Sequence, residues 1–159
     1  MYVYKDFIDL GVLVIKFSGS FVDDEARQSV LHIARSMSQH EIQAIRTVIL
    51  DLKDITSTTM ANTDTAGVSH WKRELFSVSN LPIKDIAAHI ASMKVFEILP
   101  ENSVAKDGFI KRTAHLKRTD KINSAGNSQF SDILDLLEHL DLLTIIPLLA
   151  EGWKEGPAQ

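Results

Sequence analysis

The chain has 159 residues, of which 45% are hydrophobic, and it carries a formal net charge of −4. A chain of this length can bury a hydrophobic core as one domain, and its negative charge argues against a general binder of the nucleic-acid backbone. The sequence has no cysteine, which excludes disulfides and thiolate metal sites. It also has no apolar stretch near the roughly 20 residues of a membrane-spanning helix and no signal-peptide pattern at residues 1–9, so we expect a cytoplasmic protein.

About five strands are expected from runs that are rich in β-branched and aromatic side chains. The first two are separated by Asp9, Leu10 and Gly11, which predict a tight turn and an opening hairpin. The third is followed by a polar stretch over residues 53–64, which predicts a surface loop. The predicted strands cover residues 1–7, 12–17, 47–52, 85–91 and 112–116.

Helical periodicity alternates with these strands along the chain. Apolar side chains recur every three to four residues over 24–39, 67–78 and 130–140, and the last of these runs has the clearest pattern. Residues 95–109 are mixed, with Pro100 at the end of one turn or at the start of a further helix.

The order of these elements predicts an α/β fold. Strands that are linked through helices favour parallel pairing, and the opening hairpin adds one antiparallel pair. We therefore expect one layered domain over residues 1–145, with a mixed, mostly parallel sheet of about five strands, about four helices and the order β-β-α-β-α-β-α-β-α. Residues 146–159 include Pro147 and a tail with glycine and proline, which predict a partly flexible C-terminal extension.

This element order, together with the segment Asp64-Thr65-Ala66-Gly67-Val68, resembles the STAS domain family, the anti-sigma-factor antagonists of bacterial signalling. The resemblance implies that Thr65 is a phosphoacceptor at the start of the second helix, with Asp64 beside it. The long link after the third strand is more similar to the SpoIIAA-like, STAS/Sec14-like branch of the family. In that branch Asp64 and His70 match an acidic residue and a histidine on the helix.

Elementary chemistry leaves two interpretations of this segment open. Asp64 or Thr65 can simply cap the helix that follows, because capping by such side chains is common. A phosphate on Thr65 would instead add about −1.5 to −2 charges and would repel an apolar or acidic partner. Together with Gly67, His70 and Trp71, these residues form the predicted partner-binding or ligand-binding surface. An alignment that puts residues 59–62 at the motif also stays open, and it removes the signature.

Motifs for catalysis and metal binding are missing from the sequence. It contains no His-x-x-x-His pair, P-loop, dinucleotide fingerprint or Gly-x-Ser-x-Gly motif. We therefore expect no enzyme, no metal and no cofactor, with a hydrolase that uses Ser69 or His70 as a residual alternative. A basic cluster over residues 111–121 has no aromatic side chain between Phe109 and Phe130 to stack on a base, so we expect no nucleic-acid partner.

The expected function is a non-enzymatic, STAS-like regulatory module that binds a protein partner, which the resemblance implies is of the anti-sigma-factor or kinase type. The alternative is a Sec14-like domain that binds a small molecule or lipid, with the loop at 53–64 as a lid. The apolar segment 142–153 either folds back over the sheet or provides a homodimer contact or a partner groove.

Overall fold

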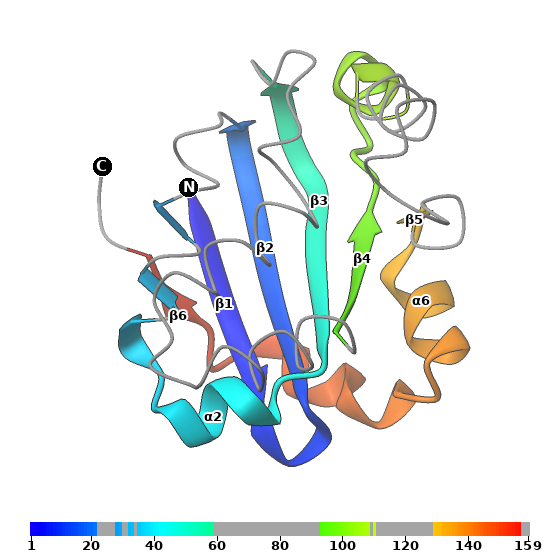
Figure 1. The fold of residues 1–159 in the computed structure, drawn as a ribbon. Helices are drawn as coiled ribbons and strands as arrows, with labels where there is room; N and C mark the ends of the chain where they lie inside the picture. Colours follow the sequence, from blue (N-terminus) through cyan, green and yellow to red (C-terminus); the bar gives the residue numbers. More distant parts are fainter. Residues whose placement is uncertain are drawn as a thin grey trace.

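A sheet of six strands organises the part of the chain that the computed structural model describes, which is residues 1–21, 28–29, 32–33, 35–58, 93–108, 110 and 129–156 (Figure 1). The strands lie in the order β5-β4-β3-β2-β1-β6. β2, β3, β4 and β5 pair in parallel, whereas β1 pairs antiparallel with both β2 and β6. The elements in chain order are β1 (Tyr2–Phe7), η1 (Ile8–Leu10), β2 (Val12–Phe21), α2 (Gln39–Ala44), β3 (Thr47–Thr58), β4 (Lys94–Ile98), β5 (Gln129–Phe130), α6 (Ile133–His139), η3 (Leu143–Ala150) and β6 (Lys154–Glu155).

The predicted opening hairpin is present, and its turn depends on Gly11. Gly11 has a φ of 68°, in the left-handed region that favours glycine. A Cβ atom at this position would lie 2.8 Å from the carbonyl oxygen of Ala44. The carbonyl oxygen of Gly11 accepts hydrogen bonds from the backbone N–H groups of Arg46 and Thr47, at 2.8 and 3.0 Å. The turn therefore also fixes the start of β3.

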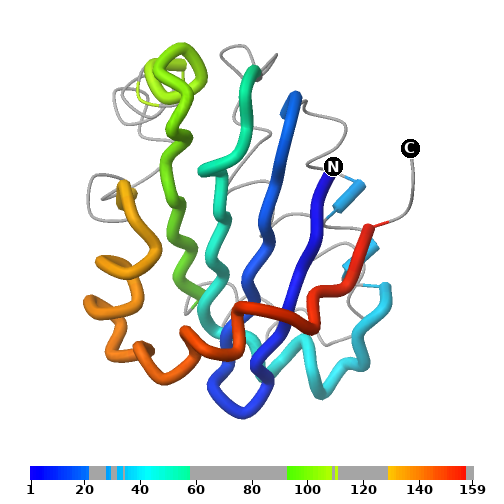
Figure 2. The backbone as a smooth tube through the Cα atoms, turned by 180° about the vertical axis from the view of Figure 1, so that it is seen from behind, coloured from blue at the N-terminus to red at the C-terminus, as the bar shows by residue number. Residues whose placement is uncertain are grey.

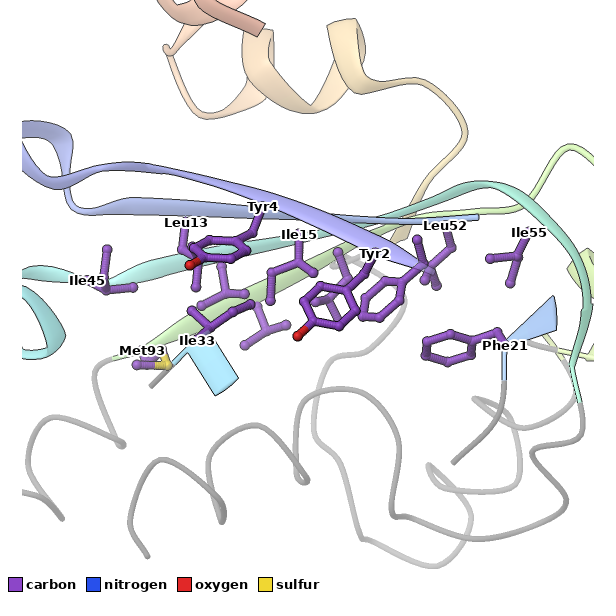
Figure 3. Close-up of a cluster of buried hydrophobic side chains, with 14 of the residues drawn as sticks. Tyr2, Tyr4, Leu13, Ile15, Phe21, Ile33, Ile45, Leu52, Ile55 and Met93 are labelled. Atoms are coloured by element: carbon purple, nitrogen blue, oxygen red, sulfur yellow. The ribbon is translucent and has the colours of Figure 1, made fainter. Parts of the chain in front are cut away.

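One face of the sheet carries the larger core (Figure 3). Tyr2 and Tyr4 of β1 are buried in it but keep partners for their hydroxyl groups. The Tyr2 hydroxyl lies 2.8 Å from Nδ1 of His32, and the Tyr4 hydroxyl lies 3.3 Å from Oγ of Ser36. Buried tyrosines need such partners because an unpaired hydroxyl is costly to bury. The apolar members of this core include Leu13, Ile15, Ile33, Ile45, Leu50, Leu52 and Ile55.

The opposite face carries a second core, which is covered by α6 and η3. Successive side chains of a strand point to opposite faces, so the continuous apolar run of β2 supplies both cores. Leu136, Leu137 and Ile145 pack here against the sheet. The sheet residues of this core are Val12, Val14, Ile49, Phe96 and Ile98.

The predicted α/β class and the single mixed sheet are confirmed, but the strand number and the element order differ from the prediction. The described residues form six strands instead of about five, and three of these, β4, β5 and β6, lie where no strand was predicted. β4 lies within the region that was mixed in the sequence. The predicted strands at 85–91 and 112–116 and the predicted helix at 67–78 lie outside the described residues, and the domain boundary at 145 stays a prediction.

β3 continues to Thr58, so the predicted loop over 53–64 is wrong for its first six positions. The pairing of β3 with β4 stops at Asp51 and Ile98, whereas its pairing with β2 continues to Phe21 and Thr58 through two irregularities. On the β4 side, the described residues make one further backbone hydrogen bond, from the N–H of Glu101 to the carbonyl of Lys53 at 3.1 Å. Of residues 53–57, only Ile55 is buried, which explains why the composition looked like a loop.

Two helix boundaries also differ from the prediction. Within the helix expected over 24–39, residues 28–29, 32–33 and 35–36 are helical, but Met37 and Ser38 are not, and Ser38 caps a new helix, α2. Ser38 and Glu41 form a reciprocal capping box, with hydrogen bonds of 3.0 and 3.1 Å. The helix expected from Phe130 begins at Ile133, because Phe130 belongs to β5 and the Asp132 side chain caps the Leu134 N–H at 2.9 Å.

Candidate functional site

The predicted site residues Asp64, Thr65, Gly67, His70 and Trp71 all lie outside the described residues. The description of the chain stops at Thr58 and resumes at Met93. The phosphoacceptor role of Thr65 and the binding roles of its neighbours stay predictions. The basic cluster at 111–121 also lies outside the described part.

A candidate surface within the described residues is formed by the segment that crosses the second core, residues 142–156, which we call the C-terminal strap (Figure 2). It follows α6, runs through η3 past the ends of β2 and β1, and ends in β6. Gly156 closes it by donating its N–H to the carbonyl oxygen of Tyr2, at 3.1 Å. The strap joins the last part of the described chain to its first strand.

The strap begins with a defined helix stop. Asp141 has a φ of 57°, in the left-handed region. The N–H of Leu142 donates to the carbonyl oxygen of Leu137 at 2.8 Å, and the N–H of Asp141 donates to the carbonyl oxygen of Glu138 at 3.1 Å. These two bonds are the Schellman pattern, in which the left-handed position is most often glycine. The turn redirects the chain from α6 into η3.

Three contacts fix the strap, two of them to the sheet and one within the strap itself. Ile145 is only 1% exposed in the second core. The ammonium of Lys5 donates to the carbonyl oxygens of Leu148 and Glu151, the latter at 2.6 Å, so a cation caps the carboxyl end of η3. The indole N–H of Trp153 donates to the carbonyl of Leu149 at 2.8 Å. The strap is therefore a fixed part of the fold between α6 and β6.

The outer side of this strap is apolar. Leu143 and Ile146 are 47% and 36% exposed, and Leu148 is 51% exposed. Residues three apart eclipse on a 3-10 helix, so Leu143 and Ile146 form one row. A single exposed leucine is ordinary, but three large apolar side chains within six residues are not. We call Leu143, Ile146 and Leu148 the apolar ridge.

The part of the chain that carries the ridge is rich in exposed acidic residues. Residues 122–153 contain no lysine and no arginine. The same stretch carries five carboxylates, all on exposed residues, which we call the acidic rim: Asp132, Asp135, Glu138, Asp141 and Glu151. The absence of lysine and arginine from residues 122–153 can be seen in the sequence, but the exposure of the apolar ridge and of the acidic rim cannot.

A second feature is a buried carboxyl group inside β3, at the position where the ladder between β3 and β4 ends. Asp51 is 6% exposed and stands in register between Lys16 of β2 and Ile98 of β4. Its Oδ1 accepts the backbone N–H of Lys53 at 3.1 Å. Burial raises the pKa of Asp51, against the weaker opposing effects of that hydrogen bond and of the Lys16 charge. The Lys16 ammonium itself lies 3.6 Å from Oδ2 of Asp54.

Glu97 of β4 is the other buried carboxyl group that stands out in the described ranges. Gln129 of β5 faces it in register, and the Gln129 side-chain amide donates to Oε2 of Glu97 at 3.3 Å. This bond helps to explain why so short a strand holds its place at the sheet edge. Glu97 and Asp51 point to opposite faces of the sheet, because Asp51 is in register with the next residue, Ile98.

The described residues bring together no three His, Asp or Glu side chains that could hold a metal ion. In that same part of the chain, we find no helix with the length and apolar character needed to cross a membrane. No protein-family model and no curated protein matches this chain.

Proposed function

We propose that this chain is a non-enzymatic, STAS-like protein–protein interaction module of the cytoplasm, and that the apolar ridge is its contact surface. The exposure of Leu143, Ile146 and Leu148 on a segment that is otherwise anchored is the observation that carries the proposal. Exposed apolar clusters with a polar surround are typical of protein interaction sites.

The anchoring of the ridge also supports this function. Ile145 lies in the core directly beside Ile146, and Lys5 holds the carbonyl groups that follow the ridge. A partner that binds here would not have to order the strap first, and ordering a segment costs conformational entropy. A preformed surface of this kind suits reversible binding.

Photo-crosslinking in the host cell tests this proposal. A photoreactive phenylalanine analogue at Ile146 is expected to give one dominant protein adduct. The same analogue at Val104, which is more exposed but lies on another helical segment, serves as the control. If Ile146 gives no adduct, or only the adducts that Val104 gives, the ridge is not a contact surface.

The regulatory part of the proposal is phosphorylation of Thr65, as the family resemblance implies. Intact-mass analysis of protein from its own host is expected to show an increment of one phosphate that maps to Thr65, and Thr65→Ala is expected to lose it. An increment that maps to another residue, or none under any growth condition, would leave Thr65 as a helix cap.

A small-molecule or lipid site is the second candidate function, and Asp51 is the observation that favours it. Open α/β sheets bind ligands at the carboxyl ends of their parallel strands, and Asp51 is in register with Ile98, the last residue of β4. A buried carboxyl group with a raised pKa is common in such sites. Native mass spectrometry is expected to show a bound ligand that Asp51→Asn releases. Asp54→Asn, three residues along β3, is the matched control.

A further inference from the structure

The partner chemistry of the apolar ridge follows from the charges around it. We propose that the ridge binds a basic, amphipathic helical segment of another protein, whose apolar face covers the ridge and whose lysines or arginines pair with the acidic rim. This inference rests on the proposed function, because it names the partner of the same surface.

The charge distribution carries the choice. Residues 122–153 carry five exposed carboxylates, three exposed apolar side chains of the ridge and no lysine or arginine. Two basic side chains reach the strap, and both have partners there: Lys5 bonds to carbonyl oxygens of the strap, and Lys154 pairs with Asp6. Complementary charge guides a partner to such a surface. A partner of like charge is repelled, which makes the surface selective as well as attractive. An acidic or neutral polar partner would leave the acidic rim without compensating charge.

The same charges disfavour the two other occupants of an apolar surface. In a symmetric dimer through the strap, each acidic rim would face the acidic rim of the other copy. An anionic membrane surface would be repelled by the carboxylates, since membrane-binding helices carry lysine and arginine on their polar face. A basic protein segment satisfies both the apolar and the charged part of the surface.

Two residues on α6 show how the rim and the ridge act together. Asp135 and Glu138 are one helical turn apart and both are exposed, on the side of α6 away from the buried Leu136 and Leu137. Leu134, beside Glu138 on the same side, is 48% exposed. A helix that docks on the strap can therefore extend onto α6 with the same pattern of apolar and acidic contacts.

A titration with two designed peptides tests the inference on the full chain. The first is an amphipathic helix of about 18 residues, long enough for five turns, made of leucine and lysine. The second has glutamate in place of every lysine. We expect the leucine–lysine peptide to bind, the leucine–glutamate peptide not to bind, and binding to weaken at least roughly tenfold between about 50 and 500 mM salt.

Variants of the chain decide whether binding occurs at this surface. The double change Asp135→Lys with Glu138→Lys is expected to lower the affinity for the leucine–lysine peptide about tenfold. The double change Leu143→Ser with Ile146→Ser is expected to lower this affinity by at least as much. Glu101→Lys with Asp107→Lys, at exposed positions outside α6 and the strap, changes the net charge by the same amount as the α6 double variant and is the matched control, which is expected to leave affinity unchanged. Circular dichroism checks that each variant is folded.

The possible outcomes separate the inference from the function on which it rests. Equal binding of the two peptides, or equal affinity of the wild type and the α6 double variant, overturns the basic partner. If Ile146 still gives a specific crosslink in the cell, the proposed function as an interaction module is retained, and its partner is not a basic helix. Self-association that Leu143→Ser with Ile146→Ser abolishes would assign the ridge to a second copy and also overturns the inference.

Discussion

The ammonium of Lys5 donates to the carbonyl oxygen of Glu151 at 2.6 Å, although the two residues are 146 positions apart in the chain. Lys5 also donates to the carbonyl of Leu148, so one strand side chain caps the end of η3. Gly152 allows this approach, because a Cβ atom there would lie 3.1 Å from the Lys5 nitrogen and its φ is 84°. The first strand and the C-terminal strap are therefore one structural unit.

Removing this cap is expected to loosen the strap. Lys5→Met keeps most of the aliphatic stem but loses both hydrogen bonds, and we expect the free energy of unfolding to fall by about 1 kcal/mol, because the site is exposed to solvent. Amide exchange at Gly156, which bonds to Tyr2, should accelerate more than exchange in β2. Lys94→Met, at an exposed position of β4, is expected to change neither measurement.

Ile145 and Ile146 are neighbours of the same residue type with opposite burial, 1% and 36% exposed. Ile145→Ala is expected to lower the free energy of unfolding by about 2–4 kcal/mol, because it opens a cavity in the second core. Ile146→Ala is expected to cost less than about 1 kcal/mol and to weaken partner binding instead. Urea unfolding and the peptide titration measure the two effects, and similar stability losses would contradict the assigned exposure.

Asp141 ends α6 in a conformation that glycine adopts most easily. Asp141→Gly is expected to raise the free energy of unfolding by roughly 0.5 kcal/mol, and Asp141→Ala to lower it by about 1 kcal/mol, because a Cβ atom is unfavourable in the left-handed region. Thermal unfolding of the three proteins gives the order. If alanine is as stable as glycine, Asp141 does not hold the left-handed position in solution.

The buried carboxyl group of Asp51 predicts a pH dependence with a definite sign. Because burial raises the pKa of Asp51, the native state binds its proton more tightly than the unfolded state. Stability from this group is therefore greatest below its unfolded pKa of about 3.8 and falls as the pH rises through the folded pKa. Asp51→Asn should remove this decrease in stability. The free energy of unfolding of the variant, relative to that of the wild type, should therefore grow as the pH rises above about 3.8.

Urea unfolding from about pH 4 to pH 8 measures this difference. Asp54→Asn removes a half-exposed carboxylate from the same strand and is expected not to reproduce the trend. A stability difference between Asp51→Asn and the wild type that stays constant with pH would show that Asp51 is not buried as described.

Local sequence signals predicted the elements whose side chains carry a strong pattern. The aromatic and β-branched runs gave β1, the start of β2 and the start of β3, and Gly11 gave the turn between the first two. The amphipathic pattern after residue 130 gave α6, although Phe130 looked like its first apolar residue. Phe130 instead pairs with Ile98 as β5, because the Asp132 cap places the helix start three residues later, at Ile133.

Elements and contacts without a local sequence signal depend on residues that are distant in the chain. Lys154 and Glu155 are polar and exposed, and only the unpaired edge of β1 makes them a strand. The polar end of β3 is extended because β2 continues beside it. Lys5 is an ordinary surface lysine until the strap brings two carbonyl groups to it.

By itself, the sequence determined the α/β class, the opening hairpin and the gap in basic residues over 122–153, because these depend on side chains a few positions apart. Only the tertiary structure decided that Ile145 is buried and Ile146 exposed, that Asp51 is buried, and that the strap returns to β1. Asp51 is buried between strands that come before and after it in the chain, and the pairing of β6 with β1 joins segments more than a hundred residues apart. No local pattern in the strap encodes which of its apolar side chains will face the sheet.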